Sequence, residues 1–184
     1  MSNITKRAMA QSLKKILLVK DLDKIIITDI TNDCGINRQT FYYHFKDIYD
    51  LLEWIFANEV VEKIEKETTI ETWQENFKYV LDYMLKNKKF IIKTYNSLSR
   101  KTLIDFLFKQ YNTIFIEIVN DLSKNYNITR ENKVFIANFY KYGFAGIIEN
   151  WIVTEMKESP ESIIKKLDVM ISGSFEEAVK KMSN

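Results

Sequence analysis

Residues 28–46 read TDITNDCGINRQTFYYHFK, which is the pattern of two short helices joined by a tight turn. Gly35 follows the first helical segment, where a glycine can adopt the positive φ that ends a helix. Asn37 then carries a side chain suited to capping the N-terminus of a second helix. In that helix Phe41 and Phe45 lie four residues apart, so they share one face, which we expect to point inward. The stretch predicts a helix-turn-helix.

The other side of the second helix has the chemistry of a DNA-reading surface. It carries amide, hydroxyl, aromatic and basic side chains and no carboxylate: Arg38, Gln39, Thr40, Tyr42, Tyr43, His44 and Lys46. Arginine and amide side chains can read base edges, whereas Tyr, Thr, His and Lys can hold phosphates. In the preceding helix Thr28 is placed to be the N-cap, and Asp29 suits the first turn. We therefore predict that the second helix is a recognition helix for DNA.

The longer run TDITNDCGINRQTFYYHFKDIYDLL, residues 28–52, resembles the DNA-binding signature of TetR/AcrR-type transcription regulators. The resemblance is motif-specific over residues 25–56. It implies an all-helical homodimer that binds a pseudo-palindromic operator in double-stranded DNA. It also implies roles for single residues, which are phosphate contacts for Thr28, Tyr42, His44 and Lys46 and base contacts for Arg38, Gln39 and Tyr43.

Composition and charge agree with such a protein. Hydrophobic residues make up 46% of the 184 residues, and the chain has only 4 Gly and 1 Pro, which favours long helices joined by short turns. The net charge is +2, but residues 1–46 hold eight Lys or Arg against four Asp, and the remainder holds 19 basic and 21 acidic residues. A basic N-terminal segment on a mildly acidic body is typical of a DNA reader with a separate regulatory domain, although scattered surface charge gives the same numbers.

The pattern of apolar residues predicts an all-α fold of about nine helices in two domains. Residues 1–47 would form a three-helix DNA-binding domain, and residues 48–184 a helical ligand-binding and dimerisation domain. A helix capped by Asp47 would run to about residue 66 and link the two. Residues 68–72 are polar and β-branched and lack helical periodicity, so this stretch is the expected boundary between the part with the linking helix and the rest of the body. The run Ile25-Ile26-Ile27 is read as an apolar connector in the core.

The last two predicted helices, residues 129–156 and 160–179, are richer in apolar residues than one small bundle needs. We expect them to pair with a second copy of the chain in a four-helix interface. Two glycines on adjacent helical turns favour close approach of another helix, with room for a small ligand as the alternative. The residues expected at this interface are Gly143, Gly146, Ile147, Trp151, Leu167, Met170 and Ile171.

The body bears a narrower resemblance. FYKYGFAGIIENWIVTEMKESPESII at residues 139–164, RQTFYYHF at 38–45 and LLEWIF at 51–56 are similar to TetR-type regulators of dihydroxyacetone kinase operons. In that subgroup an activator takes its signal from a protein partner, a kinase-subunit paralogue. The controlling signal is therefore either a small-molecule effector or a protein co-regulator. Body aromatics such as Trp73, Phe77 and Tyr111 could line an effector cavity, although aromatics at helical spacing are more often ordinary core.

Other classes of function are not supported by the sequence. His44 is the only histidine and Cys34 the only cysteine, so neither a zinc site nor a Ser-His-Asp arrangement is expected. We expect no cofactor and no enzymatic activity. A single cysteine fits a reducing cytoplasm, and we expect neither a signal peptide nor a membrane-spanning segment. The alternative to a DNA-binding regulator is a helical protein-interaction or sensor module whose helix-turn-helix packs against a protein.

Overall fold

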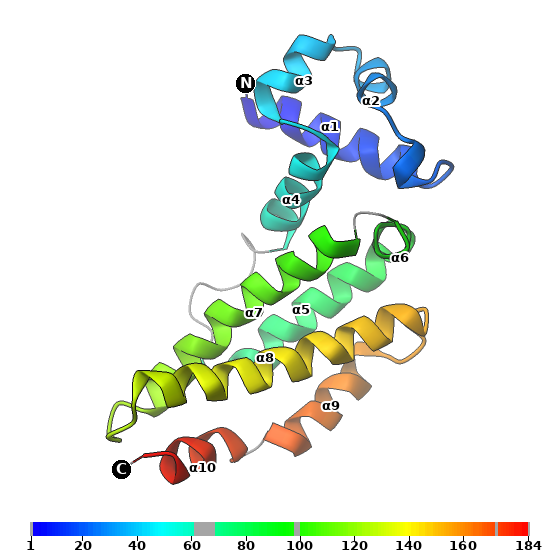
Figure 1. The fold of residues 1–184 in the computed structure, drawn as a ribbon. Helices are drawn as coiled ribbons and strands as arrows, with labels where there is room; N and C mark the ends of the chain where they lie inside the picture. Colours follow the sequence, from blue (N-terminus) through cyan, green and yellow to red (C-terminus); the bar gives the residue numbers. More distant parts are fainter. Residues whose placement is uncertain (1, 61–68, 98–99, 172, 184) are drawn as a thin grey trace. The chain divides into compact units, whose positions relative to one another are not determined.

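The structure of the protein is a computed structural model that describes residues 2–60, 69–97, 100–171 and 173–183. Within those ranges every regular element is helical, so the prediction of an all-α fold is confirmed (Figure 1). In chain order the elements are α1 (Ser2–Leu17), the short 3-10 helix η1 (Leu22–Lys24), α2 (Ile27–Cys34), α3 (Arg38–His44), α4 (Ile48–Glu59), α5 (Trp73–Lys86), α6 (Lys88–Tyr95), α7 (Arg100–Leu122), α8 (Arg130–Val153), α9 (Pro160–Ile171) and α10 (Ser174–Lys181).

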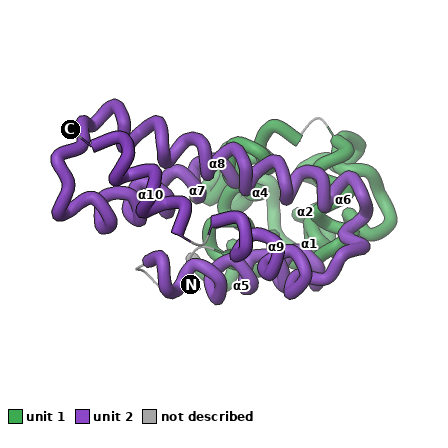
Figure 2. Tube along the Cα trace, turned by 90° about the horizontal axis from the view of Figure 1, so that it is seen from below, with its two compact units in different colours: residues 1–63, 87–106 green, residues 64–86, 107–184 purple. Residues whose placement is uncertain are grey.

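The chain forms two compact units (Figure 2). The head unit is drawn from residues 1–63 and 87–106, and the body unit from residues 64–86 and 107–184. The head unit therefore contains the helix-turn-helix together with α4, α6 and the first residues of α7. The body unit contains α5, the rest of α7 and the last three helices.

Apolar packing explains why α6 belongs to the head unit. The ring of Phe56 in α4 lies 5.7 Å from that of Phe90 in α6 and 5.2 Å from that of Phe106 in α7, measured between centroids. Aromatic pairs at these separations add to the free energy of apolar burial. A polar contact supports the same arrangement, because Lys93 Nζ in α6 lies 3.8 Å from a carboxylate oxygen of Asp21, just before η1.

The body unit is built around a cluster of aromatic rings. Phe144 of α8 lies 4.8 Å from Phe115 of α7 and 5.0 Å from Phe77 of α5, again between ring centroids. One turn earlier in α8, Tyr140 stacks on Phe175 of α10, with ring centroids 3.5 Å apart. Burial of such rings is the main source of stability for a helical bundle.

Several local expectations from the sequence are confirmed. Gly35 has a φ of 65° and closes α2. Asn37 caps α3, Asp47 caps α4 and Thr129 caps α8, each accepting a hydrogen bond from a backbone N–H three residues later. Pro160 is the first residue of α9, where its missing N–H costs nothing.

The predicted N-cap of α2 is wrong. The helix begins at Ile27 with Ile26 as its N-cap, two residues earlier than a Thr28 cap would place them. Asp29 performs the capping instead, because its carboxylate accepts a hydrogen bond from the backbone N–H of Ile26 at 2.9 Å. The same carboxylate forms an ion pair with Lys20 at 2.5 Å. The Asp29 carboxylate therefore stabilises the start of α2 in place of the Thr28 hydroxyl. It also binds a cation and interacts favourably with the positive end of the helix dipole.

Two further expectations are corrected. Of the connector residues, Ile25 is buried, but Ile26 is 58% exposed and Ile27 already belongs to α2. The helix predicted for residues 160–179 is two helices, because Gly173 has a φ of 75° and begins α10 in a new direction. The predicted end of the linking helix, residues 61–66, lies outside the described residues, as does Thr68.

The capping role of Asp29 leads to a pH-dependent prediction. The hydrogen bond from Ile26 and the contact with Lys20 lower the pKa of Asp29 below its ordinary value of 3.8. Because the folded-state pKa is lowered, the stabilisation is fully present above pH 3.8 and is lost as the pH falls through the lowered pKa. We expect Asp29→Ala to lower the urea midpoint at neutral pH and to lose most of this difference near pH ~2.

The control for this prediction is Glu53→Ala, because Glu53 is an exposed residue of α4 in the same unit. Its effect on the urea midpoint should be small at both pH values. An equal midpoint difference for Asp29→Ala at neutral and acidic pH would show that the carboxylate is not the stabilising group.

Candidate nucleic-acid interface

Helix α3 is held in place by its two inward phenylalanines. Phe41 is fully buried and Phe45 nearly so, and their ring centroids are 5.9 Å apart. Phe45 also lies 5.9 Å from the ring of Trp54 in α4, in an edge-on arrangement. The ammonium group of Lys6 in α1 lies 5.5 Å from the centroid of the Phe45 ring. Helix α3 is therefore held by contacts with both α1 and α4, which orient its outer face.

The turn before α3 adds a second constraint. The side-chain oxygen of Asn37 accepts hydrogen bonds from the backbone N–H of Thr40 at 2.8 Å and from the Thr40 hydroxyl at 3.0 Å. The hydroxyl of Thr40 is thus engaged in the cap and is half-buried. Asn37 therefore caps the start of α3, as the sequence indicated.

The outer face of α3 is exposed and carries one permanent cation, Arg38, while Lys46, which the sequence pattern placed on this helix, follows its C-cap Phe45. Tyr43 is 82% exposed and Tyr42 is 51% exposed, and Arg38, Gln39 and Lys46 also face the solvent. Nη2 of Arg38 donates a hydrogen bond to the hydroxyl of Tyr42 at 3.4 Å, one helical turn along. Exposed aromatic and basic side chains on a rigid helix are the groups that contact bases and phosphates in DNA complexes.

The remaining predicted contact residues lie at the edges of this face. His44 is half-buried, and its ring stands edge-on to that of Tyr43 at 4.9 Å. Thr28 is half-exposed in the first turn of α2. All eight residues predicted to contact DNA therefore lie in the head unit. Among them, Thr40 has a hydroxyl group that is hydrogen-bonded to the capping residue Asn37.

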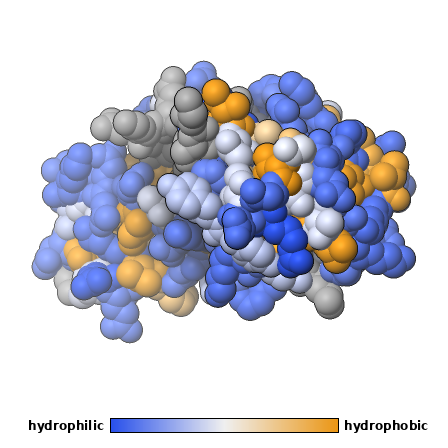
Figure 3. Space-filling view, turned by 90° about the horizontal axis from the view of Figure 1, so that it is seen from above, coloured by the Kyte–Doolittle hydropathy of each residue, from blue (hydrophilic) through white to orange (hydrophobic). Residues whose placement is uncertain are grey.

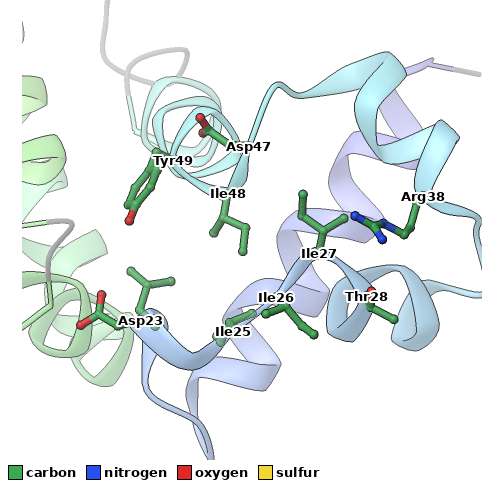
Figure 4. Close-up of a pocket in the computed structure, with 10 residues that line it drawn as sticks. Asp23, Ile25, Ile26, Ile27, Thr28, Arg38, Asp47, Ile48 and Tyr49 are labelled. Atoms are coloured by element: carbon green, nitrogen blue, oxygen red, sulfur yellow. The ribbon is translucent and has the colours of Figure 1, made fainter.

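Thr28 and Arg38 meet in one cavity of the head unit (Figure 4). Its volume is about 490 Å³, and η1, the connector after it, and the first turns of α2, α3 and α4 all contribute to its walls. Ile26, Ile48 and Tyr49 line it as well, and the sequence patterns gave none of them a place in a site.

The carboxylates of the helix-turn-helix are neutralised by α1 and the turn that follows it. Asp33 forms an ion pair with Lys15 at 2.5 Å, and Asp29 forms one with Lys20. These contacts lower the pKa of both carboxyl groups. Pairing removes negative charge from the vicinity of α3, which favours the approach of a polyanion.

The residues predicted at a dimer interface divide into two groups. Trp151, Leu167 and Ile171 are buried within the chain, and Trp151 Nε1 donates a hydrogen bond to the backbone oxygen of Glu158 at 2.8 Å. The other four are exposed on α8 and α9: Gly143, Gly146, Ile147 and Met170.

Further exposed residues extend the α8 set into a continuous face. Phe135 is 64% exposed, Phe139 is 69% exposed and Tyr142 is 59% exposed. Together with Gly143, Gly146 and Ile147 they recur every three or four residues, and we call this set the α8 stripe. A space-filling view from above, relative to Figure 1, shows apolar side chains in small groups among hydrophilic ones (Figure 3).

The body aromatics are ordinary core with one very small cavity. Trp73, Phe77, Tyr111, Phe115 and Phe144 surround a space of about 20 Å³, enough for roughly one water molecule. Burial raises the pKa of the Tyr111 hydroxyl, which has no hydrogen-bond partner among the described residues.

Neither a metal centre nor a membrane span is found in the described part of the chain. No group of three or more His, Cys, Asp or Glu side chains there is arranged to hold a metal ion. None of the described helices combines the length and apolar character needed to cross a bilayer. Burial raises the pKa of the Cys34 thiol, which keeps it protonated.

A helix-turn-helix head with a basic, aromatic recognition helix, joined to a helical body, defines a transcription regulator of the TetR type. Residues 71–173, over half of the chain, match the family TetR_C_8, described as "Transcriptional regulator C-terminal region". The protein belongs to this family.

Individual relatives agree with the family. The chain is 27% identical over 154 residues to the "HTH-type dhaKLM operon transcriptional activator DhaS" of Lactococcus lactis subsp. lactis (strain IL1403), covering 83% of this chain and 81% of that one. The solved structure of "Dihydroxyacetone kinase operon activator DhaS" has the same fold, with a TM-score of 0.72, 24% identity and coverage of 98% and 99% of the two chains. These matches are with transcriptional regulators and not with enzymes, and they confirm the resemblance seen in the sequence.

Proposed function

We propose that the protein binds a palindromic operator as a homodimer, with one α3 helix of each copy in the major groove. The observation that carries this proposal is the outer face of α3, which is exposed and basic and is fixed from behind by Phe41 and Phe45. Arg38, Gln39 and Tyr43 would contact bases, and Thr28, Thr40, Tyr42, His44 and Lys46 would contact the DNA backbone. The two half-sites would lie about one helical turn apart or slightly more.

The homodimer would form through the last helices of the body unit. The α8 stripe presents a row of exposed apolar residues and two glycines, and on α9 Val169 and Met170 are each 74% exposed. Exposed apolar surface of this kind is typical of a contact between proteins. A two-fold interface would bury α8 and α9 of each copy in a four-helix arrangement.

Control of DNA binding would come from the body. Residues 1–47 would be the DNA-binding domain and residues 48–184 the regulatory and dimerisation domain, with α4 as the connection between them. A small-molecule effector or a protein co-regulator that binds the body would shift the population between two head spacings. Because a relative is named as an activator of the dhaKLM operon, upstream regions of dihydroxyacetone kinase genes are the first DNA to test. A protein that regulates such genes acts in the cytoplasm.

The test is enrichment of random duplex DNA by the purified protein, followed by titration of variants on the selected site. We expect an inverted repeat. Lys46→Ala and Tyr42→Phe should weaken binding to every sequence, and Lys46→Ala should lower the slope of log affinity against log salt by about one. Gln39→Ala should instead relax the preference at one base pair per half-site, by about 1–3 kcal/mol.

Lys157→Gln is the matched control, because Lys157 is an exposed lysine of the body unit. Its affinity and salt slope should equal those of the unchanged protein. The assignment of α3 as the recognition helix is refuted if no consensus sequence is selected. It is refuted equally if Lys46→Ala, Tyr42→Phe and Gln39→Ala all bind DNA as tightly as the unchanged protein. Either result would favour a protein-interaction module.

A further inference from the structure

A groove of about 630 Å³ lies between α7 and the N-terminal part of α8, within the body unit. Four polar side chains line it, two carboxamides and two cations: Asn112 and Asn120 of α7, and Arg130 and Lys133 of α8. Aliphatic side chains such as Ile116 and Ala137 complete the lining. We call it the α7–α8 groove. It is separate from the helix-turn-helix and from the small aromatic cavity of the core.

The charge of the groove is entirely positive. No carboxylate is among its lining residues. Within the described part of the chain, neither Arg130 nor Lys133 makes an ion pair or a side-chain hydrogen bond, in contrast to the paired lysines 78, 124, 166 and 181 of the same unit. Lys133 is half-buried. A cation without a protein partner beside a groove attracts an anion that enters it.

The backbone adds donors at the same place. Arg130 is the first residue of α8, a helix of 24 residues whose positive end therefore lies at the groove. The Thr129 side chain accepts from the N–H of Asn132, and the Thr129 carbonyl accepts from the N–H of Lys133. The N–H groups of Arg130 and Glu131 have no partner inside the helix, as is general for a first turn, and they are available to an anion.

The orientation of the Asn112 carboxamide group leaves a further hydrogen-bond donor beside the groove. Lys141 Nζ donates to the side-chain oxygen of Asn112 at 3.4 Å and to that of Asn138 at 2.6 Å. Because an ammonium group can only donate, the Asn112 oxygen must face Lys141, and its NH₂ group is left to donate elsewhere. The groove therefore has a guanidinium and an ammonium group at the N-terminal end of α8, carboxamides of α7 along its wall, and aliphatic side chains between them.

We propose that the α7–α8 groove is a binding site for a small oxyanion, either a phosphate group or a carboxylate. The planar guanidinium of Arg130 can bind two oxygens of such a group, while Lys133 supplies a point charge. The aliphatic residues leave room for a short carbon chain attached to the anion. The proposal concerns the body unit alone and does not depend on DNA binding.

The test is titration of the full-length protein with two probes, inorganic phosphate and citrate, by calorimetry and by amide NMR shifts. Sodium chloride at equal ionic strength serves as the reference. We expect saturable binding of at least one probe, with the largest shifts at residues 130–133. The double variant Arg130→Gln/Lys133→Gln should weaken that binding about tenfold or more, since charge-assisted hydrogen bonds are lost.

A second variant and a control make the test specific. Asn120→Asp places a negative charge in the groove and should also weaken binding, whereas Lys157→Gln, outside the groove, should leave it unchanged. Circular dichroism establishes that each variant is folded. The proposal is overturned if neither probe binds saturably at millimolar concentration, or if the double variant binds as tightly as the unchanged protein.

Discussion

Replacing Phe41 by Ala should remove most of the stability of the head unit. The side chain is fully buried, and its ring contacts those of Tyr42 and Phe45 at 5.9 Å. Truncation of a buried Phe leaves a cavity and costs about 3–5 kcal/mol. Because whole domains are stable by only about 5–15 kcal/mol, a loss of this size brings the unit close to unfolding.

A urea titration followed by far-UV circular dichroism measures this effect. The matched control is Tyr43→Ala, which removes an aromatic ring of similar size from a nearby, 82% exposed position. We expect that control to change the free energy of unfolding by less than about 0.5 kcal/mol. Hydrogen exchange at the amides of α3 should increase strongly in Phe41→Ala only. Similar stability of the two variants would mean that α3 is not anchored by Phe41.

The second large effect is expected from a charge placed on the α8 stripe. Phe139 is 69% exposed, so Phe139→Glu should leave the fold of the single chain intact. In the proposed interface the same carboxylate would be buried without a partner, which is strongly unfavourable. We expect monomers in analytical ultracentrifugation. Operator affinity should fall by about a hundredfold or more, because each head would then bind its half-site alone.

Ile147→Glu, on the same stripe, should give the same result. Val19→Glu is the control, because Val19 is 86% exposed in the head unit and lies outside the stripe. It introduces the same charge and should leave the mass in solution unchanged. If Phe139→Glu and Ile147→Glu both sediment like the unchanged protein, the dimer does not form through α8, or the chain does not dimerise.

These two experiments also separate the parts of the proposal. Phe41→Ala tests how the head unit is built, and Phe139→Glu tests how two copies meet. A variant that stays dimeric and folded but binds DNA more weakly, such as Lys46→Ala, tests the DNA contact itself. The three properties are therefore measured independently.

Features that depend on neighbouring residues were predictable from the sequence. The positive φ of Gly35 and the caps formed by Asn37, Asp47 and Thr129 involve residues within three or four positions of one another. The inward placement of Phe41 and Phe45 follows from helical spacing alone. For the same reason the TetR-type motif is recognisable from the amino-acid sequence, since its glycine turn and recognition helix form one continuous segment.

Features that depend on distant residues were not predictable. Asp29 replaces Thr28 at the start of α2 partly because Lys20, nine residues away, is brought to its carboxylate at 2.5 Å. The apolar spacing of α9 and α10 looks continuous, but the chain turns at Gly173 and seats Phe175 on Tyr140. Polar contacts between α5 and α9, such as that of Gln74 with Asp168 at 2.6 Å, likewise join residues far apart in the chain.

By itself, then, the sequence determined the helical class, the helix-turn-helix and the chemistry of its outer face, because helix formation and capping are local. Only the tertiary structure decided which apolar residues of the last helices face the core. Trp151, Leu167 and Ile171 are buried and Phe139, Ile147 and Met170 are not, although all six are apolar residues on two neighbouring helices. The physical reason is that a helix with apolar residues on several faces has no preferred inner side until other helices pack against it.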